Sequence, residues 1–413
     1  MTTAVSFIAL FALLVTLHEW GHFIVAKLSG VHVREFSIGI GTKLMAWEKN
    51  GTKYTIRLIP MGGYVRMASA RDIQSMGEAG RQVFITETEN GISEISQMED
   101  VMARPVVMGE WLDDNSKLEV FDIETSEAET IDVSKDVWFT NDTEFREKIA
   151  QKDEWIESAS VWKRVLIYLA GPVMNMVLAA SLFIGSGLLI GSYVEEAYIG
   201  SMDESFPISE TSVENGDLLL TIEGETVDKF ADIGKHIGDK GGETLIMTFS
   251  RDGEEFTEHV PILDVEGAGK MGVRAETELG VGKAFKSGIL MTVDITKATL
   301  QGVASLFTNF SFSSLGGPIY MAQATGEVTA TASSSTELVY ILMSWGAMLS
   351  INLAIVNMLP IPALDGGRIV IALIEGFRKK ALSEDLEMKI NLAGGLFILG
   401  LAFAVTISDI FSL

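Results

Sequence analysis

The chain has 413 residues, 47% of them hydrophobic, and its 56 acidic residues outnumber its 31 lysines and arginines. The net charge of -25 argues against a nucleic-acid partner, because nucleic-acid phosphates would repel the chain. The absence of cysteine excludes a disulfide scaffold, an iron–sulfur cluster, a cysteine-ligated metal site and a cysteine nucleophile.

Four long apolar stretches are each close to the length of about 20 residues that a helix needs to cross a bilayer. They cover residues 4–28, 166–194, 338–359 and 390–407. The first stretch is not typical of a cleaved signal peptide, because it lacks a basic leader and a clear cleavage site. The sequence therefore predicts a multi-pass membrane protein of the cytoplasmic membrane.

The acidic residues are concentrated in two segments between these stretches. Residues 72–160 hold 23 acidic and 7 basic residues, a net charge of -16. Residues 192–280 hold 21 acidic and 6 basic residues, a net charge of -15, and the remainder of the chain is at +6. Acidic segments between apolar, slightly basic ones are typical of water-facing domains inserted between membrane spans.

The positions of the basic residues predict the orientation of the spans. Lysines and arginines follow the first and third stretches and precede the second, whereas Glu195 and Glu196 follow the second. Because basic loops stay in the cytoplasm, residues 30–165 and 360–389 are predicted to be cytoplasmic. Both termini and residues 195–337 are then predicted to be extracytoplasmic.

Three segments outside the spans have recognisable patterns. Residues 31–67 are rich in β-formers and punctuated by glycines, which predicts strands joined by turns. Residues 200–275 predict a compact α/β unit, with strands at 218–222, 244–250 and 256–261 and a short helix at 230–237. Residues 283–310 have helical periodicity with interspersed charges, which favours an amphipathic surface helix over a fifth span. Residues 72–160 leave two alternatives open, a small acidic domain or a partly disordered segment.

The motif His18-Glu19-Trp20-Gly21-His22 lies inside the first apolar stretch. On a helix, positions i and i+4 share one face, so His18 and His22 can bind one metal ion. Glu19 lies beside them and can accept a proton from a water molecule. Ionisable residues within a span are costly, at about 2.5–3.5 kcal/mol each on insertion scales, which favours a functional site over a water-filled polar patch.

The third metal ligand is not fixed by this motif. A third histidine six residues after His22 is excluded, because that position is Leu28. Glu48 is the thermolysin-like alternative, in the predicted strand region. Asp365 is the better candidate, because it follows a third span broken by prolines, at the end predicted to be cytoplasmic and therefore on the side of the HExxH motif. The alternative for Asp365 and its following glycines is an ordinary loop turn.

The chain resembles the site-2 protease family of intramembrane zinc metalloproteases, specifically its bacterial RseP/RasP-like group with a single PDZ domain. The resemblance rests first on the HExxH motif together with Asn357, Pro360, Pro362 and Leu364-Asp365-Gly366-Gly367. Further motifs that match the family are Phe36–Gly41, Gly62–Met67, Ala170-Gly171-Pro172 with Asn175, and Leu315–Ile319. Residues 200–275 resemble the PDZ domain, although a carboxylate-binding loop is not clear near Gly191–Gly200.

The resemblance implies a role for each matching residue. His18, His22 and Asp365 would bind zinc, and Glu19 would be the general base. Asn357 and Asn175 would position the substrate backbone or the oxyanion. Gly62, Gly63 and Tyr64 would belong to a strand edge that holds an extended substrate, the alternative being a purely structural hairpin.

The resemblance also implies the activity and the partners. The leading hypothesis is an intramembrane zinc endopeptidase that cleaves type II transmembrane segments, including anti-sigma factors already cut by an upstream site-1 protease, and signal-peptide remnants. One alternative is a membrane-anchored zinc peptidase acting on soluble or misfolded polypeptides. The other is an inactive PDZ-bearing membrane scaffold. The PDZ-like unit would either bind substrate ends or exclude bulky substrates.

The predicted fold class is a polytopic α-helical membrane protein with about four transmembrane helices, a membrane-associated β-hairpin or sheet, and an inserted α/β PDZ-like domain. The predicted segments in chain order are the first span with the HExxH motif at 1–29, a membrane-associated β segment at 30–71, an acidic cytoplasmic insert at 72–161, the second span at 162–194, an extracytoplasmic PDZ-like domain at 195–280, an amphipathic helix and linker at 281–336, the third span with Asp365 at 337–367, a cytoplasmic loop at 368–389 and the fourth span at 390–413.

Overall fold

The computed structural model describes residues 2–69, 72, 79–99, 102–112, 116–140, 146–265, 267–308, 317–332 and 334–412. Leu315 and Gly316 of the family-like motif at 315–319 lie outside these residues. The chain forms two compact units. Unit 1 consists of Met1–Ala179, Thr296–Thr331 and Met348–Leu413, and unit 2 of Ala180–Ile295 and Ala332–Ala347.

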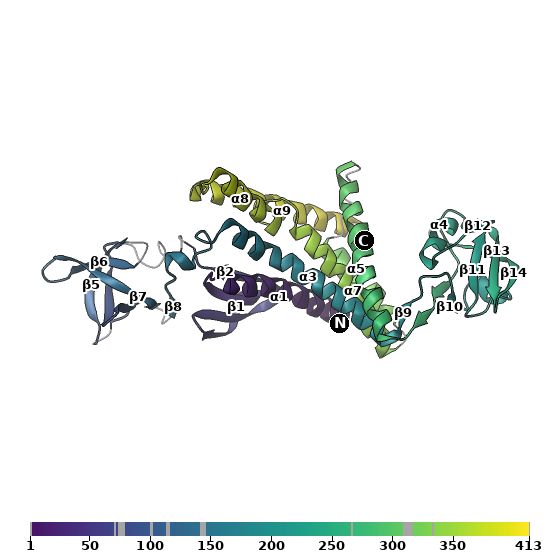
Figure 1. The fold of residues 1–413 in the computed structure, drawn as a ribbon, viewed down its shortest axis with the longest axis horizontal. Coiled ribbons are helices and arrows are strands. Elements are labelled where there is room, and N and C mark those ends of the chain that lie inside the picture. The colour runs from purple at the N-terminus through teal and green to yellow at the C-terminus, as the bar shows by residue number, and fades with distance from the viewer. Residues whose placement is uncertain are drawn as a thin grey trace. The chain divides into compact units, whose positions relative to one another are not determined.

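Among the described residues, four helices are long and apolar enough to cross a membrane. They are α1 (Thr2–Leu28), α3 (Val161–Ile190), α7 (Ser335–Asn357) and α9 (Glu384–Ser412) (Figure 1). Their number agrees with the four predicted spans. Two helix ends differ from the predicted spans. Helix α3 ends at Ile190 and not at residue 194, because Gly191 adopts a φ of +98°. Helix α9 begins six residues before 390, because its first turn is polar and was not part of the apolar run.

Strands β1 (Val33–Lys49) and β2 (Thr52–Met67) follow α1 and contact it (Figure 1). Asn50 and Gly51 join them, and both have positive φ, as a two-residue hairpin turn of this type requires. Residues 35–38 have partners on two sides, 63–66 on one and 53–56 on the other. Residues 63–67 are therefore an edge of this sheet, with ladder partners only in 33–38 among the described residues.

The acidic insert contains a closed barrel with its own hydrophobic core. Its strands are β3 (Gln82–Thr88), β4 (Gly91–Ser96), β5 (Arg104–Leu112), β6 (Lys117–Asp122), β7 (Ala128–Thr140) and β8 (Arg146–Lys148). The ring closes because β4 pairs with both β3 and β7, while β5 and β6 complete the path between them. Buried side chains such as Val83, Ile95, Val106 and Val120 fill it. The described residues therefore form the small domain of the two alternatives.

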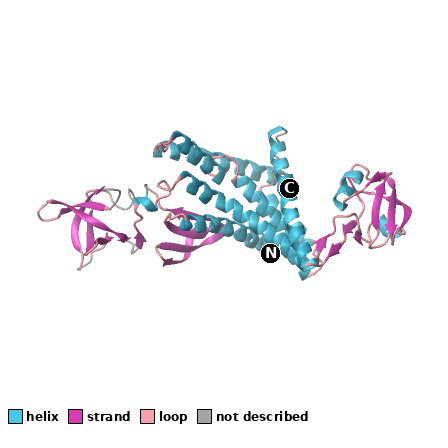
Figure 2. Cartoon of the chain, in the orientation of Figure 1, coloured by secondary structure: helices cyan, strands magenta, loops and turns pink. Residues whose placement is uncertain are grey.

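Unit 2 contains the predicted α/β unit, and Figure 2 draws its strands, like all others, in magenta. The main sheet has the order β12-β11-β13-β14, with β11 at Leu218–Ile222, β12 at Glu225–Thr226, β13 at Thr244–Arg251 and β14 at Glu254–Pro261. The expected short helix is a 3-10 turn followed by α4 (Ile233–Ile237). Leu219, Met247 and Phe249 are fully buried in the core of this sheet.

Two predicted loop regions contain helices. The segment 281–336 holds α5 (Val281–Thr308) and a second helix, α6 (Pro318–Ala330), instead of one helix and a linker. The segment 368–389, predicted to be a loop, begins inside α8 (Asp365–Arg378). This helix was missed because its apolar residues are spaced on one face and do not form a continuous run. Asp365 is consequently the first residue of a helix rather than the end of the third span.

Candidate metal centre

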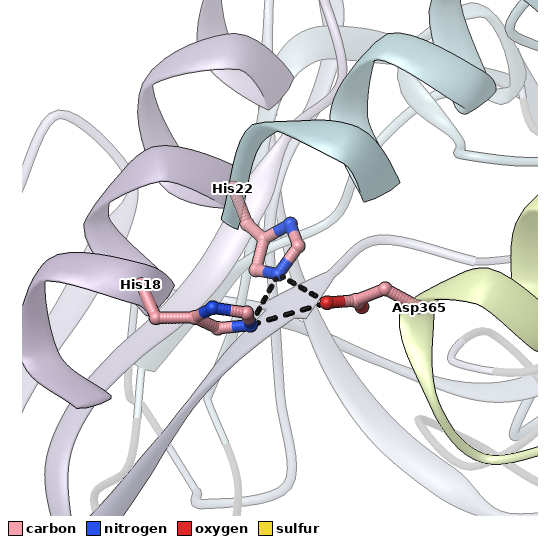
Figure 3. A group of neighbouring side chains, drawn as sticks. All are labelled: His18, His22 and Asp365. Atoms are coloured by element: carbon pink, nitrogen blue, oxygen red, sulfur yellow. Dashed lines mark hydrogen bonds and ion pairs between the residues drawn. The ribbon is translucent and has the colours of Figure 1, made fainter. Parts of the chain in front are cut away.

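Helix α1 places His18 and His22 one turn apart on the face that points into unit 1. Both side chains are buried, each with 6% of its surface exposed. Their Nε2 atoms lie 3.2 Å apart, and the two rings point toward each other in Figure 3. The i, i+4 spacing of the motif therefore produces two converging imidazole nitrogens, as a helix dictates.

Asp365 completes the group from the first turn of α8. Its Oδ2 lies 3.1 Å from His18 Nε2 and 3.2 Å from His22 Nε2 (Figure 3). The two following glycines explain the close approach. A Cβ on Gly366 would collide with the carbonyls of Met358 and Leu359, and one on Gly367 with the carbonyl of Ile361. The Gly-Gly pair thus lets α8 begin against the turn that ends α7.

The outer nitrogens of both imidazoles have partners on α3. His22 Nδ1 lies 2.7 Å from the carbonyl oxygen of Ile167, which can only accept a hydrogen bond. His18 Nδ1 lies 3.2 Å from the side-chain amide of Asn175. Since a neutral imidazole carries one proton, placing it on Nδ1 leaves the Nε2 lone pair of each ring facing Asp365. This is the form in which histidine binds a metal.

Gly171 on α3 gives the two rings their space. A Cβ at this position would collide with His22 Nε2 and lie 2.7 Å from two ring atoms of His18. Gly21 on α1 similarly faces the backbone of Ala170, where a Cβ would collide with its carbonyl oxygen. Close packing of α1 on α3 at small residues therefore brings the imidazoles against the α3 backbone.

The donor set fits zinc. His18, His22 and Asp365 each offer one ligand atom, and these atoms lie within 4.8 Å of one another. Two ligands of a tetrahedral zinc ion, bound at about 2.0–2.2 Å, are separated by about 3.3–3.5 Å, close to the separations of 3.1–3.2 Å seen here.

A cavity of about 280 Å³ adjoins the three side chains. Its lining comes from α1, β2, α3, the end of α7 and the start of α8. Of the residues singled out from the sequence, Glu19, Gly63, Tyr64 and Asn357 line this cavity together with the three candidate ligands.

Three other sequence candidates lie elsewhere. Gly62 is not in the lining and faces Ile40. Asn175 is fully buried behind His18, with its backbone oxygen accepting a 2.8 Å hydrogen bond from Ser350 Oγ. Glu48 accepts a 2.7 Å hydrogen bond from the backbone N–H of Gly51 in the hairpin turn. Glu48 is therefore occupied at a turn and is not part of the candidate metal group.

Arg368, Tyr168 and Ala363 are among the residues of the cavity that sequence reasoning missed. Arg368 could have been found from its spacing, because it lies three residues after Asp365 and so on the same helical face. Ala363 carries a φ of 78°, unusual for a residue with a Cβ, in the turn that leads to Asp365. Tyr168 was not identifiable, because its place depends on how α3 packs.

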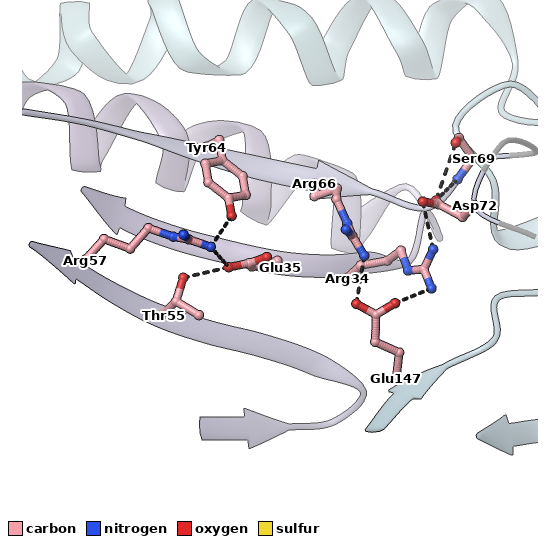
Figure 4. Close-up of polar contacts among 9 residues, drawn as sticks. All are labelled: Arg34, Glu35, Thr55, Arg57, Tyr64, Arg66, Ser69, Asp72 and Glu147. Carbon is pink, nitrogen blue, oxygen red and sulfur yellow. Dashed lines mark hydrogen bonds and ion pairs between the residues drawn. The ribbon is translucent and has the colours of Figure 1, made fainter. Parts of the chain in front are cut away.

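A network of complementary charges supports the strand that carries Tyr64. Arg57 donates hydrogen bonds of 2.8 Å to Glu35 Oε1 and 2.6 Å to the Tyr64 hydroxyl oxygen, and Thr55 donates one of 2.8 Å to Glu35 (Figure 4). Burial raises the pKa of Glu35, but the hydrogen bonds from Arg57, Thr55 and Tyr64 lower it below its ordinary value. We call Glu35, Thr55, Arg57 and Tyr64 the arginine–carboxylate network.

The sequence matches peptidase family M50 over residues 6–401. This match covers nearly the whole chain. The chain belongs to peptidase family M50, the site-2 protease family.

Three M50-type relatives are similar to this chain over their full length. Zinc metalloprotease RasP of Oceanobacillus iheyensis is 32% identical, with 99% of each chain covered. The regulator of sigma-W protease RasP of Bacillus subtilis is 32% identical over 99% of this chain and 98% of its own. The probable protease eep of Enterococcus faecalis is 34% identical over 99% of each chain. This M50 chain is accordingly a zinc metalloprotease and a multi-pass membrane protein.

One of the solved structures that match part of this chain is a PDZ domain from Listeria monocytogenes. It covers 20% of this chain and 88% of its own length, at 18% sequence identity and a TM-score of 0.18. A score this low does not establish a shared fold, so the PDZ-like domain at 195–280 stays a prediction.

Proposed function

We propose that this M50 protease is an intramembrane endopeptidase in which His18, His22 and Asp365 bind zinc and Glu19 is the general base. The observation that carries the proposal is the convergence of three buried ligand atoms, two of them on a helix apolar enough to cross a membrane. Glu19 faces the same cavity. Burial of such a set is costly unless a cation is bound there.

The proposed chemistry is hydrolysis of a peptide bond. Zinc at these ligands would supply Lewis acidity that activates a water molecule and polarises the scissile carbonyl. Glu19 accepts a proton from the water, the water oxygen adds to the carbonyl carbon, and the C–N bond breaks. The same proton then passes from Glu19 to the leaving amine, so that Glu19 returns to its ionised form.

The edge strand at 63–67 supports a mode of substrate binding. A transmembrane helix must unwind before cleavage, because its backbone amides are bonded within the helix. Residues 63–67 pair with 33–38 along one side, and Gly63 and Tyr64 line the cavity. An unwound substrate can add to this edge as a strand, with its scissile bond facing Glu19. Asn357, which lines the cavity at the end of α7, is the proposed polar contact for the substrate backbone.

We assign Asn175 a different role from Asn357. Because Asn175 is fully buried and lies behind His18, it is placed to orient the imidazole rather than to contact substrate. Its Oδ1 has no hydrogen-bond partner among the described residues. Turning the amide by half a rotation would bring this oxygen to the Nδ1–H of His18, which holds Nε2 toward Asp365.

The proposed substrates are type II transmembrane segments. They include anti-sigma factors first cut by a site-1 protease, and signal-peptide remnants. The name of the Bacillus subtilis relative, a regulator of sigma-W protease, supports the first class. The distribution of lysine and arginine supports an orientation with both termini outside and residues 30–165 and 360–389 in the cytoplasm. This orientation places the HExxH end of α1 toward the cytoplasm.

The deciding experiment compares the purified wild-type chain with Glu19→Gln and Glu48→Gln. We expect Glu19→Gln to reduce cleavage of a model transmembrane substrate about 10³-fold and to retain zinc, because it removes only the base. Glu48→Gln is the matched control and should keep both activity and zinc. Full activity of Glu19→Gln, or loss of zinc in Glu48→Gln, would contradict the assignment.

Two substrate comparisons test the finer claims. An unfolded soluble protein should be cleaved far more slowly than the transmembrane substrate; equal rates would favour the membrane-anchored peptidase alternative. A pair of substrates with one apolar segment and inverted flanking charges tests the type II preference. Because strand pairing at the 63–67 edge has a fixed direction, only one topology should be cleaved efficiently. Equal cleavage of both topologies would contradict pairing at this edge.

A further inference from the structure

Among the described residues that line the cavity, Arg368 is the only lysine or arginine. It lies three residues after Asp365 on α8, and therefore on the same helical face. Its guanidinium carbon is 5.9 Å from the centroid of the Tyr168 ring, which also lines the cavity. A permanent positive charge thus faces the place where hydrolysis is proposed.

Several other arginines of unit 1 are paired with carboxylates. Arg164 lies 2.5 Å from Glu375, Arg57 lies 2.8 Å from Glu35, and Arg34 lies 2.7 Å from Asp72. Arg368 has no carboxylate within ion-pair distance in the part of the chain that the structure describes. Its observed contact is with the face of an aromatic ring, which leaves the in-plane N–H groups of the guanidinium available. An unpaired arginine at a cavity wall is arranged to receive an anion.

The proposed reaction produces an anion in this cavity. When water adds to the scissile carbonyl carbon and the C–N bond breaks, the amino-terminal fragment gains a carboxylate where a neutral amide was. The leaving amine takes the proton that Glu19 carried, and the proton of the added hydroxyl then passes through Glu19 to the same nitrogen, so that the products are a carboxylate and an ammonium group. The new carboxylate appears beside Glu19 and Asp365, both of which are acidic and line the same wall. Zinc held by Asp365 would offset the charge of that residue, and a second cation nearby would offset the repulsion from Glu19.

We propose that Arg368 is the subsite for the carboxylate that cleavage creates on the amino-terminal product. The planar guanidinium matches a carboxylate with two parallel hydrogen bonds, a geometry that lysine does not reproduce. The proposal rests on the proposed function, because it takes the cavity as the place of cleavage. Arg368 would then be a catalytic residue, since it contacts the carboxylate formed from the scissile carbonyl.

The test measures binding rather than turnover. It uses the full chain in detergent, in the Glu19→Gln background, so that no probe is cleaved. The probes are two short fluorescent peptides of alternating leucine and alanine, one ending in a free carboxylate and one in a carboxamide. Both are titrated at pH 8, with zinc and after zinc removal, so that a direct contact of the carboxylate with the metal is measured separately.

We expect the carboxylate peptide to bind about tenfold more tightly than the amide, with or without zinc. Arg368→Gln should abolish this preference, and Arg368→Lys should restore only part of it. Arg378→Gln is the matched control, because Arg378 is exposed in the last turn of the same helix and outside the cavity lining. It should retain the full preference.

Three outcomes would overturn the proposal. They are equal binding of acid and amide by the starting protein, an unchanged preference in Arg368→Gln, and an equal loss in Arg378→Gln. Zinc content of each variant shows whether the site is assembled. Because the probes are not cleaved, these outcomes are independent of the activity test on Glu19. Loss of activity in Glu19→Gln with no acid preference would leave the proposed function intact and remove only the role of Arg368.

Discussion

Two polar clusters of unit 1 are built on opposite principles. In the arginine–carboxylate network, the charge of Arg57 is matched by Glu35, and Thr55 and Tyr64 add further hydrogen bonds (Figure 4). In the histidine–aspartate cluster of His18, His22 and Asp365, three atoms that can accept a proton or a metal converge within 3.2 Å (Figure 3). The first cluster neutralises itself, whereas the second needs a cation from outside.

This difference separates structural from functional polar groups. A self-paired network loses little when solvent conditions change, and it fixes the strands that carry it. A convergent set of buried acceptors is unfavourable unless a cation binds between them. We therefore expect changes in the histidine–aspartate cluster to alter zinc binding, and changes in the arginine–carboxylate network to alter stability.

Asp365→Asn should have the largest effect. A neutral amide is a poorer zinc ligand than a carboxylate, so we expect zinc affinity to fall by at least 100-fold and activity to fall with it. Zinc content after dialysis and cleavage of a model transmembrane substrate measure the two effects. Unchanged zinc content would show that the third ligand is another residue.

Gly171→Ala tests the space around the same cluster. Since a Cβ at this position would collide with His22, the rings or α3 must shift. Misplacing ligands by such a shift costs about 10–100-fold in metal affinity. Gly395→Ala is the matched control, because a Cβ there would meet no heavy atom within 4 Å. Equal zinc affinity of the two variants would mean that Gly171 is not needed for the site.

The sequence predicted the parts of the cluster unequally. The pairing of His18 with His22 follows from local helix geometry, and so does the placement of Glu19 beside them. The contact between His18 and Asp365 joins residues 347 apart. The broken third span and its predicted cytoplasmic end made Asp365 a candidate, and the family resemblance implied its role. The position of Asn175 behind His18 depends on how α3 packs on α1. No spacing rule could distinguish that position from one facing the cavity.

The fold shows the same division between local and non-local information. Span lengths, the Asn50-Gly51 turn and the 218–222 strand follow from local patterns that the structure repeats. The barrel at 82–148 could not be predicted, because its closure depends on the parallel pairing of β4 with β7 across about 40 residues. Helix α8 was missed because only one of its faces is apolar.

Glu35→Gln makes the opposite change, in the arginine–carboxylate network. It leaves the partly buried charge of Arg57 without its carboxylate partner, which should cost about 1–3 kcal/mol of unfolding free energy. Zinc content should stay unchanged. Thermal unfolding of the detergent-solubilised chain and zinc analysis of the same sample give both quantities. Loss of zinc at unchanged stability would erase the distinction between the two clusters.

His32 gives a smaller effect that depends on pH. Burial, together with the charges of Lys27, Lys148 and Arg34, lowers the pKa of His32 from 6.5 to about 4. The unfolded chain then binds this proton at a higher pH than the folded chain does, so stability falls as pH drops from about 6.5 toward 4. We expect a loss of roughly 1–3 kcal/mol over that window. His32→Gln cannot titrate and should show a smaller loss; identical pH profiles would contradict the prediction.

The substitution Ala363→Gly should give the smallest effect. It tests whether the position of Asp365 in the histidine–aspartate cluster depends on backbone strain. Ala363 lies in the turn before Asp365 with a φ of 78°, a conformation that costs a residue with a Cβ about 1–2 kcal/mol. The arginine–carboxylate network, by contrast, lies on the extended strands β1 and β2. Ala363→Gly removes the strain but loosens the turn, so we expect a gain in unfolding free energy of at most about 1 kcal/mol. If the strain helps to place Asp365, zinc affinity should fall about threefold in the same variant, since a tenfold change corresponds to about 1.4 kcal/mol. A gain in stability with unchanged zinc affinity would show that the turn tolerates the strain without using it.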